Sequence, residues 1–149
     1  MLFRSKRGDL LELTPESFDR VMSVNVRGSF FLSQHFARRL IDDTGAVPGA
    51  FRSIIWIGSA NAEIVGDLRA DYCISKAATA MMNKLFASRL AQSGICTFEI
   101  RPGIIATDMT APARTRYDRF IADCGVPIAR WGQPADIGRT VAKIGRAHV

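Results

Sequence analysis

The chain has 149 residues, of which 48% are hydrophobic and 23% are charged, as in one soluble globular domain or part of a larger one. No apolar run approaches the roughly 20 residues that span a bilayer, and the start lacks a secretory signal, so we expect a cytoplasmic protein without a membrane partner. The net charge of +6 is dispersed among acidic residues without an aromatic–basic motif, which argues against a nucleic-acid partner.

The cysteines and histidines predict neither disulfides nor a metal site. Cys73, Cys96 and Cys124 form no CxxC pair, which is typical of a reducing compartment. His35 and His148 each lack a second ligand at the spacing that zinc sites use. We therefore expect no metal.

The first predicted element is a long helix from Thr14 to about Leu40. Thr14-Pro15-Glu16 combines a hydroxyl N-cap, a proline at the first helical position and an acid at the positive end of the helix dipole. Apolar residues then recur at roughly the helical period. Asn25 and Gly28 interrupt this pattern, and we expect a local helix defect at Asn25.

Strands and helices then alternate along the chain. The apolar run 53–58 predicts a buried parallel strand, 72–90 a second helix and 95–100 another strand. A helix is also expected within 113–123, and a last one begins at Gln133-Pro134. This order predicts an α/β fold with parallel strands, but two strands are too few for such a sheet, so we expect part of a larger fold.

The helix 72–90 carries two apolar rows instead of one. We therefore expect it to contact its own sheet and a further surface such as a partner subunit. The two rows are Ala77, Met81 and Leu85, and Ala78, Met82, Phe86 and Leu90.

Tyr72 and Lys76 lie four positions apart at the start of a predicted helix, hence on one face. A free phenol has a pKa near 10, too high for efficient proton transfer at neutral pH, and a lysine cation one turn away favours the ionised form. Ser59 directly follows the first strand, where its hydroxyl can hydrogen-bond a substrate oxygen. Asn25 would hold a water near Lys76.

The segment from Pro102 to Thr107 follows the second strand at its carboxyl end, where open α/β sheets bind ligands. Four motifs now stand in register, and together they resemble the short-chain dehydrogenase/reductase family, most closely the 3-oxoacyl-[acyl-carrier-protein] reductases. The resemblance runs from about Gly8 to Ala142. The motifs are Asn25-Val26-Arg27-Gly28, Ile57-Gly58-Ser59, Tyr72 through Lys76, and Pro102-Gly103-Ile104-Ile105-Ala106-Thr107.

The resemblance implies a role for each matching residue. Tyr72 would be the general acid in reduction and the general base in oxidation, Ser59 would polarise the substrate oxygen, and Lys76 would activate the phenol and bind the nicotinamide ribose. Asn25 would hold a proton-relay water. The nicotinamide would be cradled by Pro102, Gly103, Ile105 and Thr107. Gly58 stands where many members of the family carry serine, which we interpret as neutral because Ser59 keeps its position.

The same resemblance implies part of a doubly wound, Rossmann-type parallel-sheet fold whose N-terminal nucleotide-binding half and last strand are missing. The twelve glycines form no phosphate-binding GxGxxG pattern. The parent would use NADP or NAD to reduce a ketone, a 3-oxoacyl thioester of fatty acid biosynthesis being one candidate, and would be a dimer or tetramer. We expect this chain by itself to be inactive.

Two other readings of the sequence stay open. The chain could derive from a non-catalytic oligomerisation or binding module built on the same fold. It could also derive from an epimerase or dehydratase of the extended branch, which shares the YxxxK motif, although the pattern from Pro102 to Thr107 favours the simple reductases.

We expect the catalytic portion to be residues 6–143, flanked by non-native ends at 1–5 and 144–149. Residues 1–5 can be written GTG CTC TTC CGA TCT, whose reverse complement overlaps the codons ATC GGA AGA GCA CAC of residues 144–148. Both strings look like one sequencing-library adapter, read on opposite strands.

Overall fold

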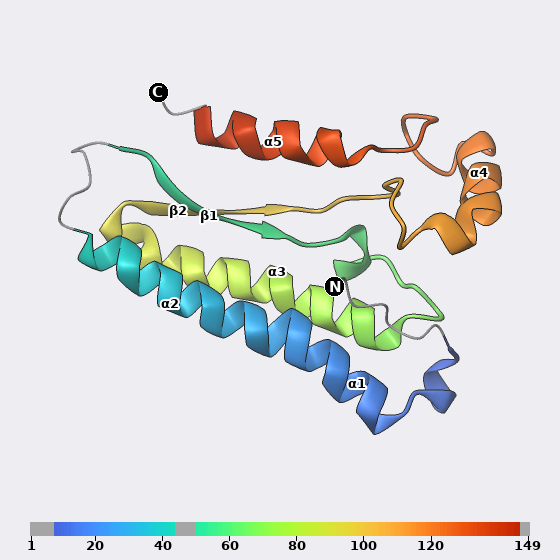
Figure 1. Cartoon of the computed structure of the whole chain (residues 1–149), viewed down its shortest axis with the longest axis horizontal. Coiled ribbons are helices and arrows are strands. Elements are labelled where there is room, and N and C mark those ends of the chain that lie inside the picture. Colours follow the sequence, from blue (N-terminus) through green and yellow to red (C-terminus); the bar gives the residue numbers. More distant parts are fainter. Residues whose placement is uncertain (1–7, 44–49, 147–149) are drawn as a thin grey trace. The chain divides into compact units, whose positions relative to one another are not determined.

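A computed structural model describes residues 8–43 and 50–146, which belong to two compact units that divide after Arg101 (Figure 1). Short 3₁₀ or π-helical turns are labelled η. The first unit contains η1 (Leu10–Glu12), α1 (Pro15–Met22), η2 (Ser23–Gly28), α2 (Ser29–Asp42), β1 (Arg52–Ile57), η3 (Ala60–Ala62), α3 (Ala70–Leu90), η4 (Ala91–Ser93) and β2 (Ile95–Ile100). The second contains η5 (Ala111–Ala113), α4 (Arg114–Ala122) and α5 (Pro134–Arg146).

The predicted first helix is one helical segment with a defect in its middle. Thr14 caps it, because its Oγ1 accepts a hydrogen bond from the Ser17 N–H at 3.3 Å and Pro15 occupies the first turn. Between α1 and α2 the segment widens into the π-helical turn η2, which contains Asn25 and Gly28. The predicted helix defect at Asn25 is confirmed, and π-turns of this kind are frequent at functional sites.

β1 and β2 pair in parallel, from Arg52 opposite Ile95 to Ile57 opposite Ile100. Both predicted strands are confirmed, although β1 runs from Arg52 to Ile57 and ends one residue earlier than expected. Gly58 still donates its N–H to the Ile100 carbonyl at 2.8 Å, so it stays beside β2.

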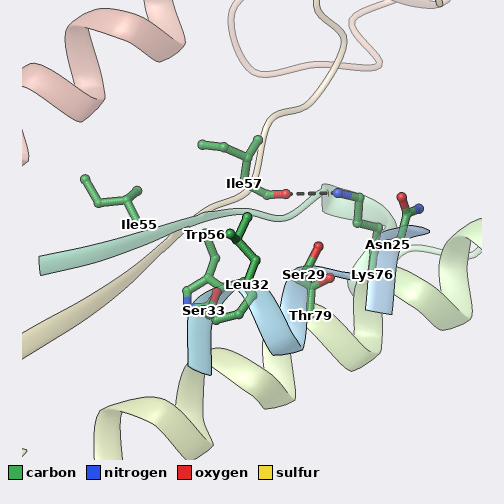
Figure 2. A pocket seen from close by; sticks show the side chains of 9 residues that line it. All are labelled: Asn25, Ser29, Leu32, Ser33, Ile55, Trp56, Ile57, Lys76 and Thr79. Atoms are coloured by element: carbon green, nitrogen blue, oxygen red, sulfur yellow. Dashed lines mark hydrogen bonds between the residues drawn. The ribbon is translucent and has the colours of Figure 1, made fainter. Parts of the chain in front are cut away.

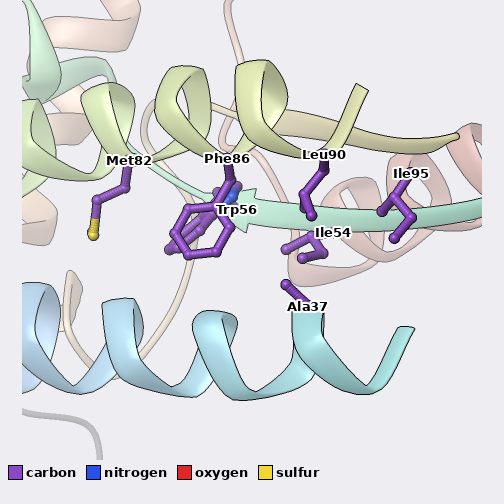
Figure 3. Close-up of a cluster of buried hydrophobic side chains, with 7 residues drawn as sticks. All are labelled: Ala37, Ile54, Trp56, Met82, Phe86, Leu90 and Ile95. Atoms are coloured by element: carbon purple, nitrogen blue, oxygen red, sulfur yellow. The ribbon is translucent and has the colours of Figure 1, made fainter. Parts of the chain in front are cut away.

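α2 and α3 pack against one face of this pair and enclose the core (Figure 3). The Trp56 and Phe86 rings are 5.6 Å apart, and Leu90 and Ile95 are almost fully buried. Trp56 of β1 is buried in this core. The core consists of Ala37, Ile54, Trp56, Met82, Phe86, Leu90 and Ile95.

The two apolar rows of α3 have different surroundings. Met82, Phe86 and Leu90 are buried in the core beside the strands, which confirms the predicted contact of this helix with its sheet. Met81 and Leu85, on the other row, are 53% and 56% exposed. What covers this second row in the whole protein stays a prediction.

In the second unit, the predicted helices near 113–123 and after Gln133 are confirmed as α4 and α5. The chain between them returns beside the loop at Ile105, which forms a parallel bridge with Gly132. α5 continues to Arg146, into the segment expected to be non-native, while residues 1–5 and 147–149 lie outside the described residues. No helix in the described ranges is long and apolar enough to cross a membrane.

Candidate active site

Tyr72 and Lys76 occupy successive turns at the start of α3, on one face as predicted. The Lys76 Nζ lies 5.6 Å from the centre of the Tyr72 ring. It also donates a hydrogen bond of 2.9 Å to the carbonyl oxygen of Ile57, the last residue of β1. The ammonium group is therefore held between the phenol ring and the end of the strand.

Burial affects the charge state of Lys76. Desolvation lowers the pKa of its ammonium below the ordinary value of 10.5, and the carboxylate of Glu99 acts in the opposite direction. The net direction is downward. Lys76 is thus a partly desolvated cation, and such a cation interacts more strongly with neighbouring groups than one in water.

The first turn of α3 is anchored by a buried acid that sequence reasoning missed. Asp71 is 1% exposed; its Oδ1 accepts from the Tyr72 N–H at 2.7 Å, and its Oδ2 accepts from the Ser17 hydroxyl at 3.4 Å. This carboxylate ties the start of α3 to α1. Its position immediately before the YxxxK motif is the signal that could have drawn attention to it.

Asn25 reaches α3 from the π-turn η2. Its side-chain amide donates to the Ser75 Oγ at 3.1 Å, and the Ser75 hydroxyl donates to the Tyr72 carbonyl at 2.8 Å. Asn25 and Lys76 also line one cavity of about 270 Å³ between η2, α2, β1 and α3 (Figure 2). A cavity with polar groups from both residues has room for ordered water.

Ser59 lies just beyond β1 and is 7% exposed. Its Oγ accepts a hydrogen bond from the Asn61 N–H at 3.1 Å, which caps η3, and η3 packs against α3. A serine hydroxyl that accepts here keeps its own proton for donation. The first unit therefore places Asn25, Ser59, Tyr72 and Lys76 around β1, η2, η3 and the start of α3.

The other predicted site residues, Pro102, Gly103, Ile105 and Thr107, lie in the second unit, on the loop before η5. Thr110, which sequence reasoning missed, organises this loop. Its Oγ1 accepts from the Thr107 N–H at 3.0 Å and lies 2.7 Å from the Ile105 carbonyl oxygen, to which it donates. The signal was a threonine three residues after Thr107, a spacing at which a hydroxyl can bond the backbone of a turn.

The aromatic and charged residues after this loop bind one another. The Trp131 Nε1–H donates to the Asp118 carboxylate of α4 at 2.7 Å, and the Tyr117 ring meets the Trp131 ring edge-on. These contacts tie the segment before α5 to α4.

Comparison with known proteins identifies the family of this chain. A family model described as "Enoyl-(Acyl carrier protein) reductase" matches residues 2–145, nearly the whole chain. The chain belongs to the short-chain dehydrogenase/reductase family. Its curated relatives include the 2-dehydro-3-deoxy-D-gluconate 5-dehydrogenase of Dickeya dadantii, which is 34% identical over 89% of this chain and 51% of its own length.

Solved structures of the family share the fold. A 3-oxoacyl-[acyl-carrier protein] reductase from Brucella melitensis, solved with NAD, is 41% identical with a TM-score of 0.92, over 97% of this chain and 57% of its own. A gluconate 5-dehydrogenase from Burkholderia cenocepacia, solved with NADP and tartrate, is 25% identical with a TM-score of 0.77, over 89% of this chain and 50% of its own.

The chain therefore contains part of a Rossmann-type α/β fold, as predicted. It spans about half the length of the curated relatives it matches.

Proposed function

We propose that the whole protein is an NAD(P)-dependent oxidoreductase that reduces a ketone on a small molecule to a secondary alcohol. The observation that carries the proposal is the placement of Lys76, whose ammonium group lies beside the Tyr72 ring and is bound to the Ile57 carbonyl, two residues before Ser59. A phenol, a cation and a hydroxyl in this arrangement suit protonation of a carbonyl oxygen.

In the proposed mechanism, the Tyr72 hydroxyl donates its proton to the substrate oxygen, while the Ser59 hydroxyl hydrogen-bonds the same oxygen and stabilises its developing charge. The Lys76 cation stabilises the phenolate that Tyr72 becomes. Asn25 holds water in the cavity it shares with Lys76, through which the proton can be replaced. When bound, a nicotinamide cofactor would supply the hydride.

The residues present fit such a cofactor. Lys76 has three N–H donors and uses one on Ile57, which leaves donors for ribose hydroxyls. At Gly103 a side chain would meet nothing within 4 Å, so this position leaves open space, and Thr110 braces the neighbouring backbone at Ile105 and Thr107. For the first unit, we propose that Lys76 and Tyr72 bind the ribose of NADP or NAD. For the loop of the second unit, we propose Pro102, Gly103, Ile105 and Thr107 as nicotinamide contacts, as the family resemblance implies.

The substrate proposal draws on the relatives. One is a 3-oxoacyl-[acyl-carrier protein] reductase and another a gluconate 5-dehydrogenase. We therefore propose a 3-oxoacyl thioester first and a keto-sugar acid second. The 149-residue chain alone is expected to be inactive, since its sequence contains no glycine-rich phosphate-binding pattern.

The test joins this chain to the N-terminal half of a related reductase and follows NADPH and NADH oxidation with each substrate class. Tyr72→Phe should reduce kcat by about 100-fold or more, the usual contribution of a positioned general acid. The chain offers a matched control, because Tyr117 is its other tyrosine and should tolerate Tyr117→Phe. Near-normal turnover by Tyr72→Phe would remove this residue from the mechanism and with it the proposal.

A second candidate, an oligomerisation module, is favoured by the exposed row of α3. Met81 and Leu85 present apolar surface there, and a parent dimer or tetramer would bury it. Sedimentation of the completed protein with Leu85→Asp distinguishes the candidates. An oligomerisation module would lose its assembly in Leu85→Asp and would show no turnover with or without the substitution. A reductase would turn over ketones when it carries the original Leu85.

A further inference from the structure

Glu99 is an acid in an otherwise mostly apolar strand, and its side chain is only 8% exposed. The Arg101 Nε donates to one of its carboxylate oxygens, Oε2, at 2.9 Å. The other oxygen, Oε1, is buried and has no hydrogen-bond partner among the residues that the structure describes. Leaving a buried carboxylate oxygen unpaired is costly, so its position requires an explanation.

The position of Gly58 accounts for where this carboxylate lies. A Cβ placed on Gly58 would come within 3.0 Å of the Glu99 Cδ and 3.1 Å of its Cγ, and closer still to Oε1. Any side chain at Gly58 would therefore displace the carboxylate. We interpreted this glycine as neutral from the sequence; the structure shows that it leaves the space that Glu99 fills.

Gly58 lies between two residues of the site. It follows Ile57, whose carbonyl binds the Lys76 ammonium, and it precedes Ser59. The negative charge of Glu99 raises the pKa of Lys76, against the larger effect of burial. Tyr72 is the titratable residue that lies beside Lys76 on the same helix, α3. The residues of η2, α2 and β1 that line the cavity with Lys76 carry no titratable group.

We propose that Glu99 is a positioning residue of this site. Its buried carboxylate fits there because Gly58 has no side chain, and it keeps the Lys76 ammonium group charged and bound at the end of β1. This inference rests on the proposed role of Lys76 as a cation. Without Glu99, the desolvated lysine would lose its proton at lower pH, and above that pH the site would lack the positive charge that stabilises the Tyr72 phenolate.

The proposal is tested on this chain without cofactor or substrate. The chain is labelled with ¹³C at lysine Cε, and the Lys76 signal, one of four at positions 6, 76, 84 and 143, is identified by its loss in Lys76→Arg. Its titration midpoint is compared between the parent chain and Glu99→Gln, which removes the charge while keeping the shape. We expect Glu99→Gln to move the midpoint to lower pH.

Glu63→Gln is the matched control, because Glu63 also binds Arg101 but is 73% exposed, and it should leave the Lys76 midpoint unchanged. Gly58→Ala, which keeps the charge but displaces it, should move the midpoint in the same direction as Glu99→Gln. It should have no further effect in a Glu99→Ala background. If Glu99→Gln fails to fold, the midpoint measured in Gly58→Ala tests the proposal instead.

An unchanged midpoint in a folded Glu99→Gln chain overturns the proposal, as do equal shifts in Glu99→Gln and Glu63→Gln. Activity enters neither comparison. A failure here therefore leaves the proposed reductase function standing, and an inactive completed enzyme leaves the midpoint result unaffected.

Discussion

The ammonium group of Lys76 on α3 is bound at 2.9 Å by the carbonyl oxygen of Ile57 at the end of β1. This hydrogen bond joins the helix that carries the phenol to the strand that leads into Ser59. In the proposed mechanism, the positive charge held there stabilises the phenolate that Tyr72 becomes.

Lys76→Met should abolish most activity and hardly affect folding. In the completed protein we expect a loss of about 100-fold or more in kcat. The free energy of unfolding should change by less than about 1 kcal/mol, because losing one hydrogen bond is offset by removing a desolvated charge. Turnover assays and urea unfolding check both, with Lys84→Met, on the exposed side of α3, as the control.

The burial of Lys76 should also affect how the free energy of unfolding depends on pH. Because burial lowers the pKa of folded Lys76 below its ordinary value of 10.5, the folded chain releases this proton before the unfolded chain does. The contribution of Lys76 to the free energy of unfolding therefore increases as the pH rises from the folded pKa towards 10.5. Urea unfolding at several alkaline pH values should show a slope that Lys76→Met reduces; an identical slope contradicts this assignment.

Thr110→Val should loosen the loop that we propose for the nicotinamide. The valine has the shape of threonine but cannot bond the Ile105 carbonyl or the Thr107 N–H, which Thr110 now does. We expect the KM for the cofactor to rise by about 5- to 30-fold, as the loss of one or two hydrogen bonds implies, with a smaller change in kcat. Thr115→Val, at an exposed position of α4, is the control, and equal effects of both would argue against a role for Thr110.

The two apolar rows of α3 should respond differently to truncation. Leu90 is 1% exposed, so Leu90→Ala should destabilise the chain by about 2–5 kcal/mol, the usual cost of a buried leucine truncation. Leu85 is 56% exposed, and Leu85→Ala should stay within about 0.5 kcal/mol. The midpoints of urea unfolding measure both effects. A large loss of stability in Leu85→Ala would mean that this row is already covered in solution.

Asp136 should control the start of α5 at low pH. Its carboxylate accepts hydrogen bonds from Arg130 and from the Gln133 N–H, which lowers its pKa from 3.8 to about 2. The stabilisation is therefore complete above 3.8 and is lost as the pH falls through about 2. Amide hydrogen exchange of α5 should increase over that range, and at neutral pH in Asp136→Asn, whereas Asp123→Asn should leave it unchanged.

The order of elements could be predicted because its signals are local. The cap at Thr14, the apolar runs of the strands and the breaks around Gly94 each act on neighbouring residues, so they are visible in a linear sequence. The pairing of Tyr72 with Lys76 could be predicted equally well, since residues four positions apart on a helix share a face. The π-turn could be anticipated only as a defect, because its hydrogen-bond pattern is not written in residue types.

The sequence by itself determined which segments are helix or strand and which residues we propose for the chemistry. Only the tertiary structure decided what those residues touch: the Ile57 carbonyl for Lys76, Ser75 for Asn25, and the space over Gly58 for Glu99. Each of these contacts depends on the register of β1 against β2 or on how a helix lies on them. Register and helix placement are set by the packing of the whole core around Trp56 and Phe86, which no short stretch of sequence encodes.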